Sequence, residues 1–371
     1  QSSGGFSDDN DIGDFKYDPP TDYLALCTSN LPATITPSEH FNTVLYTGDN
    51  ATSLAITGVG FQPDFVWLKR RDSSASHHLG DAVRGSTKSL LTNGTNAENT
   101  SASDRDLRSF DSDGFTVGQD YWSSVNTSSA TMVAWNWKAN GSGSSNTTGS
   151  INTTATSANV DAGFSIVSYT GTGSNATVGH GLSKAPELII VKNRSNADGW
   201  TIFHDSLNTY YLEFTNAAQV DSDTRWNDTS PTSSVFTIST DHTVNASGEN
   251  YIAYCFHSVD GYSKVNGFYI GNASTDGVFN YCGFSPRWIM IKRKNGVNNW
   301  YIYDTERTAI NPTGTVLLAD TNAAEVTQTY FQIDILSNGW KARASDGAIN
   351  ASGEYIFMAF AETPFKYSNA R

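Results

Sequence analysis

The chain repeats itself. The stretch beginning Asn245-Ala-Ser-Gly-Glu249 returns as Asn350-Ala-Ser-Gly-Glu354. Around it a longer pattern occurs three times, in which a proline is followed by an apolar run and a lysine: Pro63–Lys69, Pro186–Lys192 and Pro286–Lys292. Internal repetition of this kind indicates a tandem array of one structural unit, and arrays of β units are typical of proteins that extend, display and bind.

The repeated segments have the composition of β-strands. The runs after the three prolines are rich in β-branched and aromatic residues, and proline is tolerated at the first residue of a strand. Each unit opens on a Tyr-(Thr/Ile)-Gly corner, at Tyr46, Tyr169 and Tyr269. Short strands separated by Gly, Asn, Asp and Ser predict an all-β chain of three related β-sandwich, or jelly-roll, units. The one helix-like window is Leu79–Leu91.

The repeats set the expected domain boundaries. Residues 1–38 lie outside the pattern and are expected to be an extension that closes a preceding domain. The three sandwich repeats are then 39–138, 163–262 and 263–371, with 139–162 as a linker rich in Gly, Ser, Thr and Asn. The alternation in Ser150–Thr156 leaves open that part of this linker forms an edge strand. Only a few residues separate the second and third repeats, so these two are expected to pack tightly.

The negative charge of the chain limits the classes of partner that it can bind. The net charge is −14 at pH 7 and the pI is about 4.8, which disfavours nucleic acid and anionic membranes. Charged residues make up only 16% of the chain, a level that fits an extracellular β protein. No apolar stretch approaches the length of a membrane span. The sequence begins at Gln1 with no visible signal peptide, so we interpret it as a processed product or part of a longer chain.

The three cysteines do not indicate a metal site. Cys27, Cys255 and Cys282 have no CxxC spacing, so zinc is not expected. Cys255 and Cys282 lie in apolar strands and are predicted to be buried free thiols. A disulfide between these two remains the alternative.

The sequence favours a protein without catalytic activity. Glycosidases built on jelly rolls need two carboxylates on neighbouring strand positions. Here Glu213, Glu249 and Glu354 occur singly beside turns, and no GxSxG or HExxH motif is present. Asp205 and Asp304 are expected at equivalent places in their repeats, which suggests a structural role such as capping a turn.

Two groups of residues are candidate binding sites. Loop aromatics with neighbouring polar side chains can stack on a sugar ring and bind its hydroxyls, and the alternative is that each caps its own sandwich. These candidates are Tyr121, Trp122, Tyr210, Tyr211, Trp226, Asn227 and Asp228. Clustered carboxylates can bind Ca²⁺, the one cofactor that we consider, and the alternative is solvated turns. These candidates are Asp111, Asp113, Asp221 and Asp223.

Long motifs resemble a group of proteins from tailed marine bacteriophages and their prophage relatives. In that group a lectin-like sandwich of the SPRY or concanavalin class ends in a strand similar to Phe15–Pro32, and the following units open on a segment similar to His40–Gly48. Further similar segments are Gly60–Lys69, Ser109–Gly118, Gly141–Ile151, Thr172–Arg194, Thr224–Thr237, Asp260–Lys264 and Met358–Arg371. The resemblance implies a tail fibre or other virion surface protein with lectin-like units.

Together these observations predict a non-catalytic virion appendage that is exposed at the virion surface and recognises the host surface, with carbohydrate as the expected ligand. Its expected partners are further copies of itself, with a trimer as one option, or other virion proteins. The alternative is a secreted bacterial adhesin or self-assembling filament subunit, glycosylated on its numerous Asn-X-Ser/Thr sites. A polysaccharide depolymerase is the third hypothesis.

Overall fold

The computed structural model describes residues 5–9, 11–21, 23, 25, 35–121 and 124–364. The chain divides into two compact units, Gln1–Ile35 and Thr36–Arg371. In the first unit Phe6 and Phe15 form an isolated bridge, and Asp8 accepts a hydrogen bond from the backbone of Ile12 at 3.0 Å. Half of the stretch that resembles a closing strand, Phe15–Pro32, falls outside the described residues.

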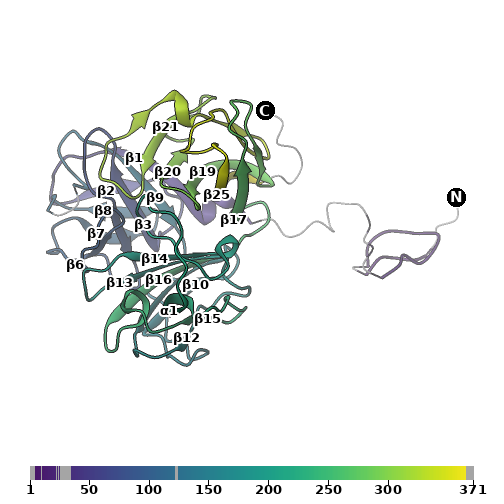
Figure 1. Cartoon of the computed structure of the whole chain (residues 1–371), viewed down its shortest axis with the longest axis horizontal. Coiled ribbons are helices and arrows are strands. Elements are labelled where there is room, and N and C mark those ends of the chain that lie inside the picture. The colour runs from purple at the N-terminus through teal and green to yellow at the C-terminus, as the bar shows by residue number, and fades with distance from the viewer. Residues whose placement is uncertain are drawn as a thin grey trace. The chain divides into compact units, whose positions relative to one another are not determined.

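The second unit is almost entirely β-structure, which confirms the all-β prediction (Figure 1). Its sheets form three pairs, each with one larger and one smaller sheet, which we call the first, second and third sandwich. The first sandwich has a larger sheet in the order β1 (Phe41–Thr47), β9 (Thr131–Trp137), β3 (Phe65–Arg70), β4 (His78–Asp81), β5 (Lys88–Leu91) and β6 (Asn99–Thr100). Its smaller sheet is β2 (Leu54–Thr57), β8 (Gly114–Val117) and β7 (Leu107–Asp111).

The second sandwich follows the same plan. Its larger sheet is β10 (Ala155–Asn159), β11 (Phe164–Thr170), β16 (Asn250–Phe256), β13 (Leu188–Asn193) and β14 (Trp200–His204). Its smaller sheet is β12 (Ala176–Gly179) and β15 (Val235–Ile238). Two single-turn helices, α1 (Asp223–Trp226) and α2 (His242–Asn245), lie in its loops, together with the 3₁₀ turn η3 (Asp205–Leu207).

The third sandwich has a larger sheet in the order β17 (Ser263–Gly271), β25 (Gly353–Pro364), β19 (Phe284–Arg293), β20 (Trp300–Asp304), β21 (Thr315–Leu318) and β22 (Val326–Thr327). Its smaller sheet is β18 (Phe279–Tyr281), β24 (Gly339–Ala342) and β23 (Ile333–Leu336). Two more 3₁₀ turns, η2 (Pro37–Glu39) and η4 (Thr329–Phe331), precede β1 and β23.

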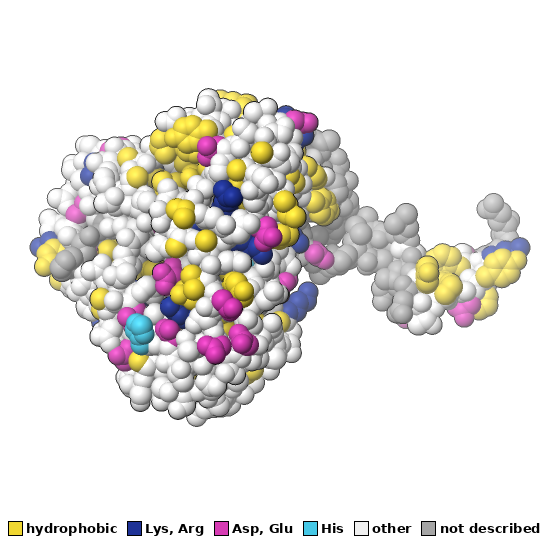
Figure 2. Space-filling model, in the orientation of Figure 1, with side chains coloured by type: hydrophobic (Ala, Val, Ile, Leu, Met, Phe, Trp, Pro, Cys, Tyr) yellow, Lys and Arg dark blue, Asp and Glu magenta, His cyan; other side chains and the backbone are white. Residues whose placement is uncertain are grey.

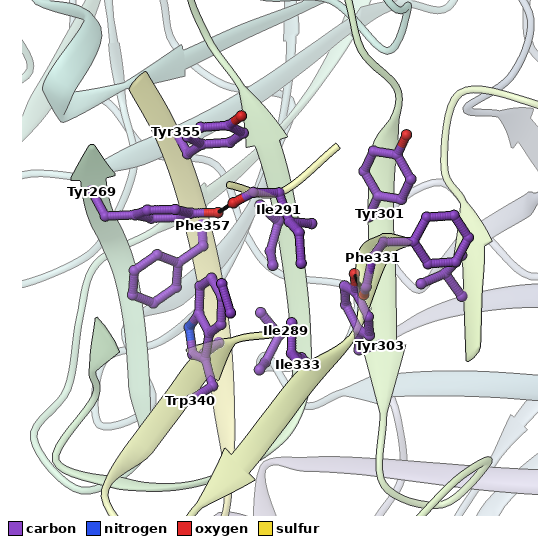
Figure 3. Close-up of a cluster of buried hydrophobic side chains, with 14 of the residues drawn as sticks. Tyr269, Ile289, Ile291, Tyr301, Tyr303, Phe331, Ile333, Trp340, Tyr355 and Phe357 are labelled. Atoms are coloured by element: carbon purple, nitrogen blue, oxygen red, sulfur yellow. Dashed lines mark hydrogen bonds between the residues drawn. The ribbon is translucent and has the colours of Figure 1, made fainter. Parts of the chain in front are cut away.

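A separate apolar core lies between the two sheets of each sandwich. In the third sandwich, Tyr269 and Tyr355 stack with ring centroids 4.9 Å apart, and Trp340 from the smaller sheet meets Tyr269 edge-on at 5.3 Å (Figure 3). The buried Tyr269 hydroxyl donates to the Ile349 carbonyl at 2.6 Å. The second core holds the equivalent stacked pair, Tyr169 and Tyr251. The tyrosine of each opening corner is therefore a core residue whose polar end finds a backbone partner.

A fourth core lies where the outer faces of the larger sheets meet. Trp137 of the first sandwich contacts Trp288 and Phe360 of the third, at centroid distances of 5.8 and 5.5 Å. Phe65 of the first sandwich lies 4.5 Å from Tyr254 of the second. Each larger sheet is consequently apolar on both faces. This explains why every residue of β13 is buried, where a sheet with one solvated face would alternate buried and exposed residues.

Equivalent hydrogen bonds join the sandwiches in a closed ring. Among the backbone bonds between sandwiches, three occupy equivalent places, with lengths of 2.7–2.9 Å: Glu98 N to Arg194 O, Gln219 N to Lys294 O and Glu325 N to Arg71 O. Side-chain bonds follow the same cycle, from Trp200 Nε1 to Leu91 O, from Trp300 Nε1 to Glu213 O, and between His77 Nε2 and Leu318 O. The first sandwich thus contacts the third, the second contacts the first and the third contacts the second, so the unit is closed and not extended.

Several local expectations change in the structure. Part of the expected linker is the edge strand β10, which pairs with β11. The helix-like window Leu79–Leu91 is wrong, because it consists of parts of β4 and β5 with a turn between them. The predicted equivalence of Asp205 and Asp304 is also wrong. Asp304 pairs with Trp288 in the third sandwich, and in the second sandwich the corresponding pair is His204 with Leu188. The residue equivalent to Asp304 is therefore His204. Cys255 and Cys282 are buried free thiols, as expected, and Cys27 lies outside the described residues.

Candidate functional site

A cavity opens on the first sandwich, beside its boundary with the second; most of its wall is apolar, and we call it the polar cavity for the four polar side chains in its lining. It has a volume of about 310 Å³ and is lined by Ser89 and Leu91 of β5, by Asn99 of β6, and by Asn96, Ala97 and Glu98 from the loop between them. Two further cavities measure about 10 Å³ each, so neither admits a ligand. The size of the polar cavity falls at the lower end of the roughly 300–1,000 Å³ typical of ligand sites.

The carboxylate in this cavity is fixed by cations from two sandwiches. Arg194 of the second sandwich donates to Glu98 at 2.7 and 3.0 Å, and Arg84 of the first donates at 3.4 Å. Burial alone would raise the pKa of Glu98, but the two guanidinium groups outweigh it and hold that pKa below its usual value. Glu98 is therefore ionised and paired, which leaves it unsuited to act as a general acid or base.

The cavity is chemically suited to binding. Its lining contributes two amides, a hydroxyl and a single carboxylate, and these groups exchange hydrogen bonds with hydroxyl groups of a ligand. The lining lacks the second carboxylate that glycoside hydrolysis needs. Asn96 is exposed and Asn99 is partly exposed, so both amides are accessible from solvent. The sequence analysis did not single out these residues, because nothing in Asn96–Asn99 differs from an ordinary polar loop.

Among the predicted sugar-binding aromatics that the structure describes, Tyr121 is the most exposed. Its side chain is 60% exposed, and the guanidinium carbon of Arg105 lies 5.1 Å from the ring centroid. Trp122, its predicted companion, lies outside the described residues. The Tyr121 ring is therefore an exposed aromatic surface, and the guanidinium group of Arg105 lies beside it.

Tyr210 and Tyr211 are partly buried. Tyr211 packs against the core of the second sandwich, and the guanidinium carbon of Arg225 lies 3.9 Å from its ring centroid. Its backbone donates to Val220 at 2.9 Å. For Tyr211, capping its own sandwich is thus the better interpretation.

The prediction for Trp226 is wrong. The side chain is 1% exposed and lies in the second core, where its ring meets Phe203 edge-on at 5.7 Å. It reaches the core because α1 ends at Trp226 and Asn227 adopts a left-handed conformation, with φ of 49°, which reverses the chain. Asn227 accepts a hydrogen bond from Asn175 at 2.7 Å, and Asp228 remains exposed. The three residues therefore do not form a sugar-stacking site.

Two of the four predicted calcium ligands serve local turns in the first sandwich. Asp113 accepts hydrogen bonds from the backbones of Gly58 and Gly60, at 3.0 and 2.7 Å, and these bonds hold its pKa below the usual value. Asp111 accepts from the Thr116 hydroxyl at 2.7 Å. Asp221 and Asp223 are exposed beside α1. Within the part of the chain that the structure describes, no group of three or more His, Cys, Asp or Glu residues is arranged to hold a metal ion.

The repeated lysines that end the proline landmarks are buried at the ring contacts. Lys69, Lys192 and Lys292 are fully buried, and their ammonium groups donate to backbone carbonyls. Lys292 donates to the Asn298 carbonyl of its own sandwich and, at 3.3 Å, to the Thr215 carbonyl of the neighbouring sandwich. Burial lowers the pKa of each lysine to about 8. The repetition identified these lysines as a pattern, but their burial depends on neighbours distant in the sequence.

These lysines predict an unusual dependence of stability on pH. Their folded-state pKa of about 8 lies below the unfolded value of about 10.4, so the unfolded chain binds more protons between these values. Stability is therefore expected to rise with pH from about 8 to about 10, by up to about 1.4 kcal/mol per pH unit for each lysine. Above about pH 10 the trend reverses, because buried tyrosines such as Tyr169 and Tyr269 have a raised pKa and ionise only on unfolding.

Urea denaturation at intervals between pH 7.5 and 10.5 measures this effect. The variant Lys192→Met should reduce the slope between pH 8 and 10 by more than one third, because it removes one of three equivalent lysines while the buried thiols of Cys255 and Cys282, whose raised pKa opposes the rise, remain. A stability that stays flat or falls over that interval in the unsubstituted protein would contradict the prediction.

Comparison with known proteins gives a family but no activity. Residues 36–364 match the family described as "Domain of unknown function (DUF7483)". This match spans most of the chain, and the protein belongs to that family. No curated protein matches the chain, and no solved structure does so either. Among the described residues, no helix has the length and apolar character needed to cross a membrane.

Proposed function

We propose that this protein is a non-catalytic recognition unit of a virion appendage and that it binds a hydroxyl-rich ligand, a carbohydrate of the host surface, in the polar cavity of the first sandwich. The observation that carries the proposal is the lining of that cavity, in which Ser89, Asn96 and Asn99 offer hydroxyl and amide groups beside an ionised Glu98. Amides and carboxylates are the groups that bind vicinal sugar hydroxyls most readily.

The surroundings of the cavity support this function. Arg194 and the Glu98–Arg194 backbone bond hold the loop Asn96–Asn99 against the second sandwich, so the polar groups are held in place before a ligand arrives. Most of the surface in Figure 2 is neither charged nor apolar, which suits display in a crowded exterior medium. The resemblance to phage virion proteins supplies the location in this proposal.

Binding is testable with a glycan array followed by calorimetric titration of the best oligosaccharide. The double variant Asn96→Ala/Asn99→Ala is expected to weaken binding at least about tenfold, because each lost hydrogen bond contributes about 0.5–1.5 kcal/mol. Asn152→Ala is the matched control, since Asn152 is an exposed asparagine in the second sandwich, away from the cavity. Equal affinity of the double variant and the control would exclude the cavity as the binding site.

The location is a separate test. Mass spectrometry of purified particles from the source phage is expected to detect this chain among the virion proteins. Its absence from the particles, together with its presence in the medium of uninfected bacterial cultures, would favour a secreted adhesin instead.

A further inference from the structure

Two residues near the end of β17, Phe268 and Ile270, expose apolar side chains at the surface. Along Ser263–Gly271 the buried Tyr269 is flanked by Phe268, which is 43% exposed, and Ile270, which is 62% exposed. Strand β17 is at the edge of its sheet and pairs only with β25. Figure 2 shows that apolar side chains reach the surface on the side of the body where Figure 1 places β17.

The second sandwich shows how this edge can be covered, whereas the equivalent strand β1 of the first sandwich is also at the edge of its sheet. Tyr169 of β11 is equivalent to Tyr269, since each stacks on the partner tyrosine of the next strand, so Ser168 and Thr170 occupy the places of Phe268 and Ile270. The edge of β11 is covered by β10, in which Ala155 lies opposite Ser168. The Ser168 carbonyl also accepts from Thr154 N at 2.7 Å. The covered strand carries hydroxyl side chains at these two positions, whereas β17 carries apolar ones.

Among the residues that the structure describes, none gives β17 such a cover. The residues before β17 form the tight turn Val259–Ser263, whereas β11 is preceded by a long segment that includes β10. The first half of β17 instead contacts the second sandwich, where the Asn266 side chain donates to Glu187 at 2.9 Å. The open part of the edge is therefore Gly267–Gly271.

The equivalence also gives the direction of the backbone groups. Because the Ser168 carbonyl points toward β10, the backbone groups of Phe268 and, two residues on, Ile270 point toward the open edge. Those of Tyr269 point toward β25, with which it is paired. Outward-facing backbone groups beside exposed apolar side chains form a template for pairing with another strand.

We propose that the open edge of β17 pairs with the same edge of a second copy of this chain, antiparallel and centred on Tyr269. In this register Phe268 lies opposite Ile270 of the partner subunit, and the outward-facing backbone groups of the two residues meet. The arrangement is self-complementary, as a two-fold interface requires, because Ile270 then lies opposite Phe268 of the partner subunit. Aromatic and β-branched side chains are a favourable cross-strand pair.

A second copy is favoured over an unrelated strand because, in this register, the exposed Phe268 and Ile270 of each subunit pack against each other across the two-fold axis. A pairing over Gly267–Gly271 is short, so the dimer is expected to dissociate on dilution. The dimer joins the larger sheets of two third sandwiches and leaves the polar cavity of the first sandwich outside the paired strands.

The test is sedimentation velocity of the full chain over a range of concentrations. The unsubstituted protein is expected to form a reversible dimer, and Ile270→Lys to weaken association at least about tenfold, because it places an ammonium group opposite the partner's Phe268. Thr170→Lys is the matched control: Thr170 is the equivalent exposed residue on β11, and this variant is expected to dimerise normally.

A second variant addresses the backbone. Ile270→Pro removes an outward-facing N–H while leaving the pairing with β25, and edge strands tolerate proline, so it is expected to fold and to lose the dimer. Equal thermal midpoints of the two lysine variants would show that both are folded. A monomer at every concentration of the unsubstituted protein, or undiminished association of Ile270→Lys, would overturn the proposal.

Discussion

Replacing Asp304 with alanine is expected to lower the free energy of unfolding by about 3–5 kcal/mol. Asp304 is fully buried and forms an ion pair with Arg307, whose side chain is also fully buried. It also accepts a hydrogen bond from Trp135 Nε1 of the first sandwich at 3.0 Å. Burial alone would lower the pKa of Arg307, but Asp304 and Glu325 hold it above the usual value, so the arginine stays charged when its partner is removed.

The loss of stability in Asp304→Ala arises from the buried positive charge of Arg307, which loses one of its carboxylate partners. The second sandwich suggests a control for this explanation. There His204 and Leu207 stand where the third sandwich has Asp304 and Arg307. The double variant Asp304→Ala/Arg307→Leu removes both charges and is expected to recover a large part of the loss, because buried ion pairs are often replaceable by apolar residues. Urea denaturation measures both variants, with Asp113→Ala at an exposed turn as the reference. A double variant as unstable as Asp304→Ala would contradict this account.

The second large effect is expected from Trp137→Ala, which should cost about 3–5 kcal/mol. Trp137 is 1% exposed and its ring contacts Phe41 and Phe65 of the first sandwich as well as Trp288 and Phe360 of the third. Its indole N–H makes no hydrogen bond in the folded chain, so the loss reflects packing alone. Because the fourth core is shared, the variant is expected to destabilise all three sandwiches together.

Unfolding followed by tryptophan fluorescence and by far-ultraviolet circular dichroism tests this cooperativity. The two signals should change in one coincident transition, in the variant as in the unsubstituted chain. Trp226→Ala, within the core of the second sandwich alone, serves as the comparison. Two separated transitions, with only one displaced by Trp137→Ala, would show that the sandwiches unfold independently, as units in an extended array do.

Local patterns predicted what depends on local contacts. The runs that follow Pro63, Pro186 and Pro286 contain β-branched and aromatic residues, and they form β3, β13 and β19. Cys255 lies in β16 and Cys282 lies between β18 and β19, and both are buried free thiols, as predicted. The errors arose where short-range signals compete. The window Leu79–Leu91 has helix-like spacing, yet pairing of β4 with β3 and β5 decides its conformation.

At the candidate site, too, the outcome depends on contacts with residues distant in the sequence. Asn96–Asn99 has the composition of a solvated loop, and its Glu98 is fixed by Arg84 and by Arg194, which comes from another sandwich. Trp226 has polar neighbours in the sequence that suggest exposure, but the left-handed turn at Asn227 directs the ring into the core. Neither outcome is encoded within a few residues of the side chain concerned.

The amino-acid sequence by itself determined the all-β character of this protein and the places of its repeated strands, because strand formation follows from the composition and spacing of neighbouring residues. Only the tertiary structure decided that the larger sheets close around a fourth core, because the bonds that close the ring join groups far apart in the sequence, among them backbone groups such as Glu98 N and Arg194 O. Every residue carries those groups, so their pairing across some hundred positions leaves no signature in the side chains.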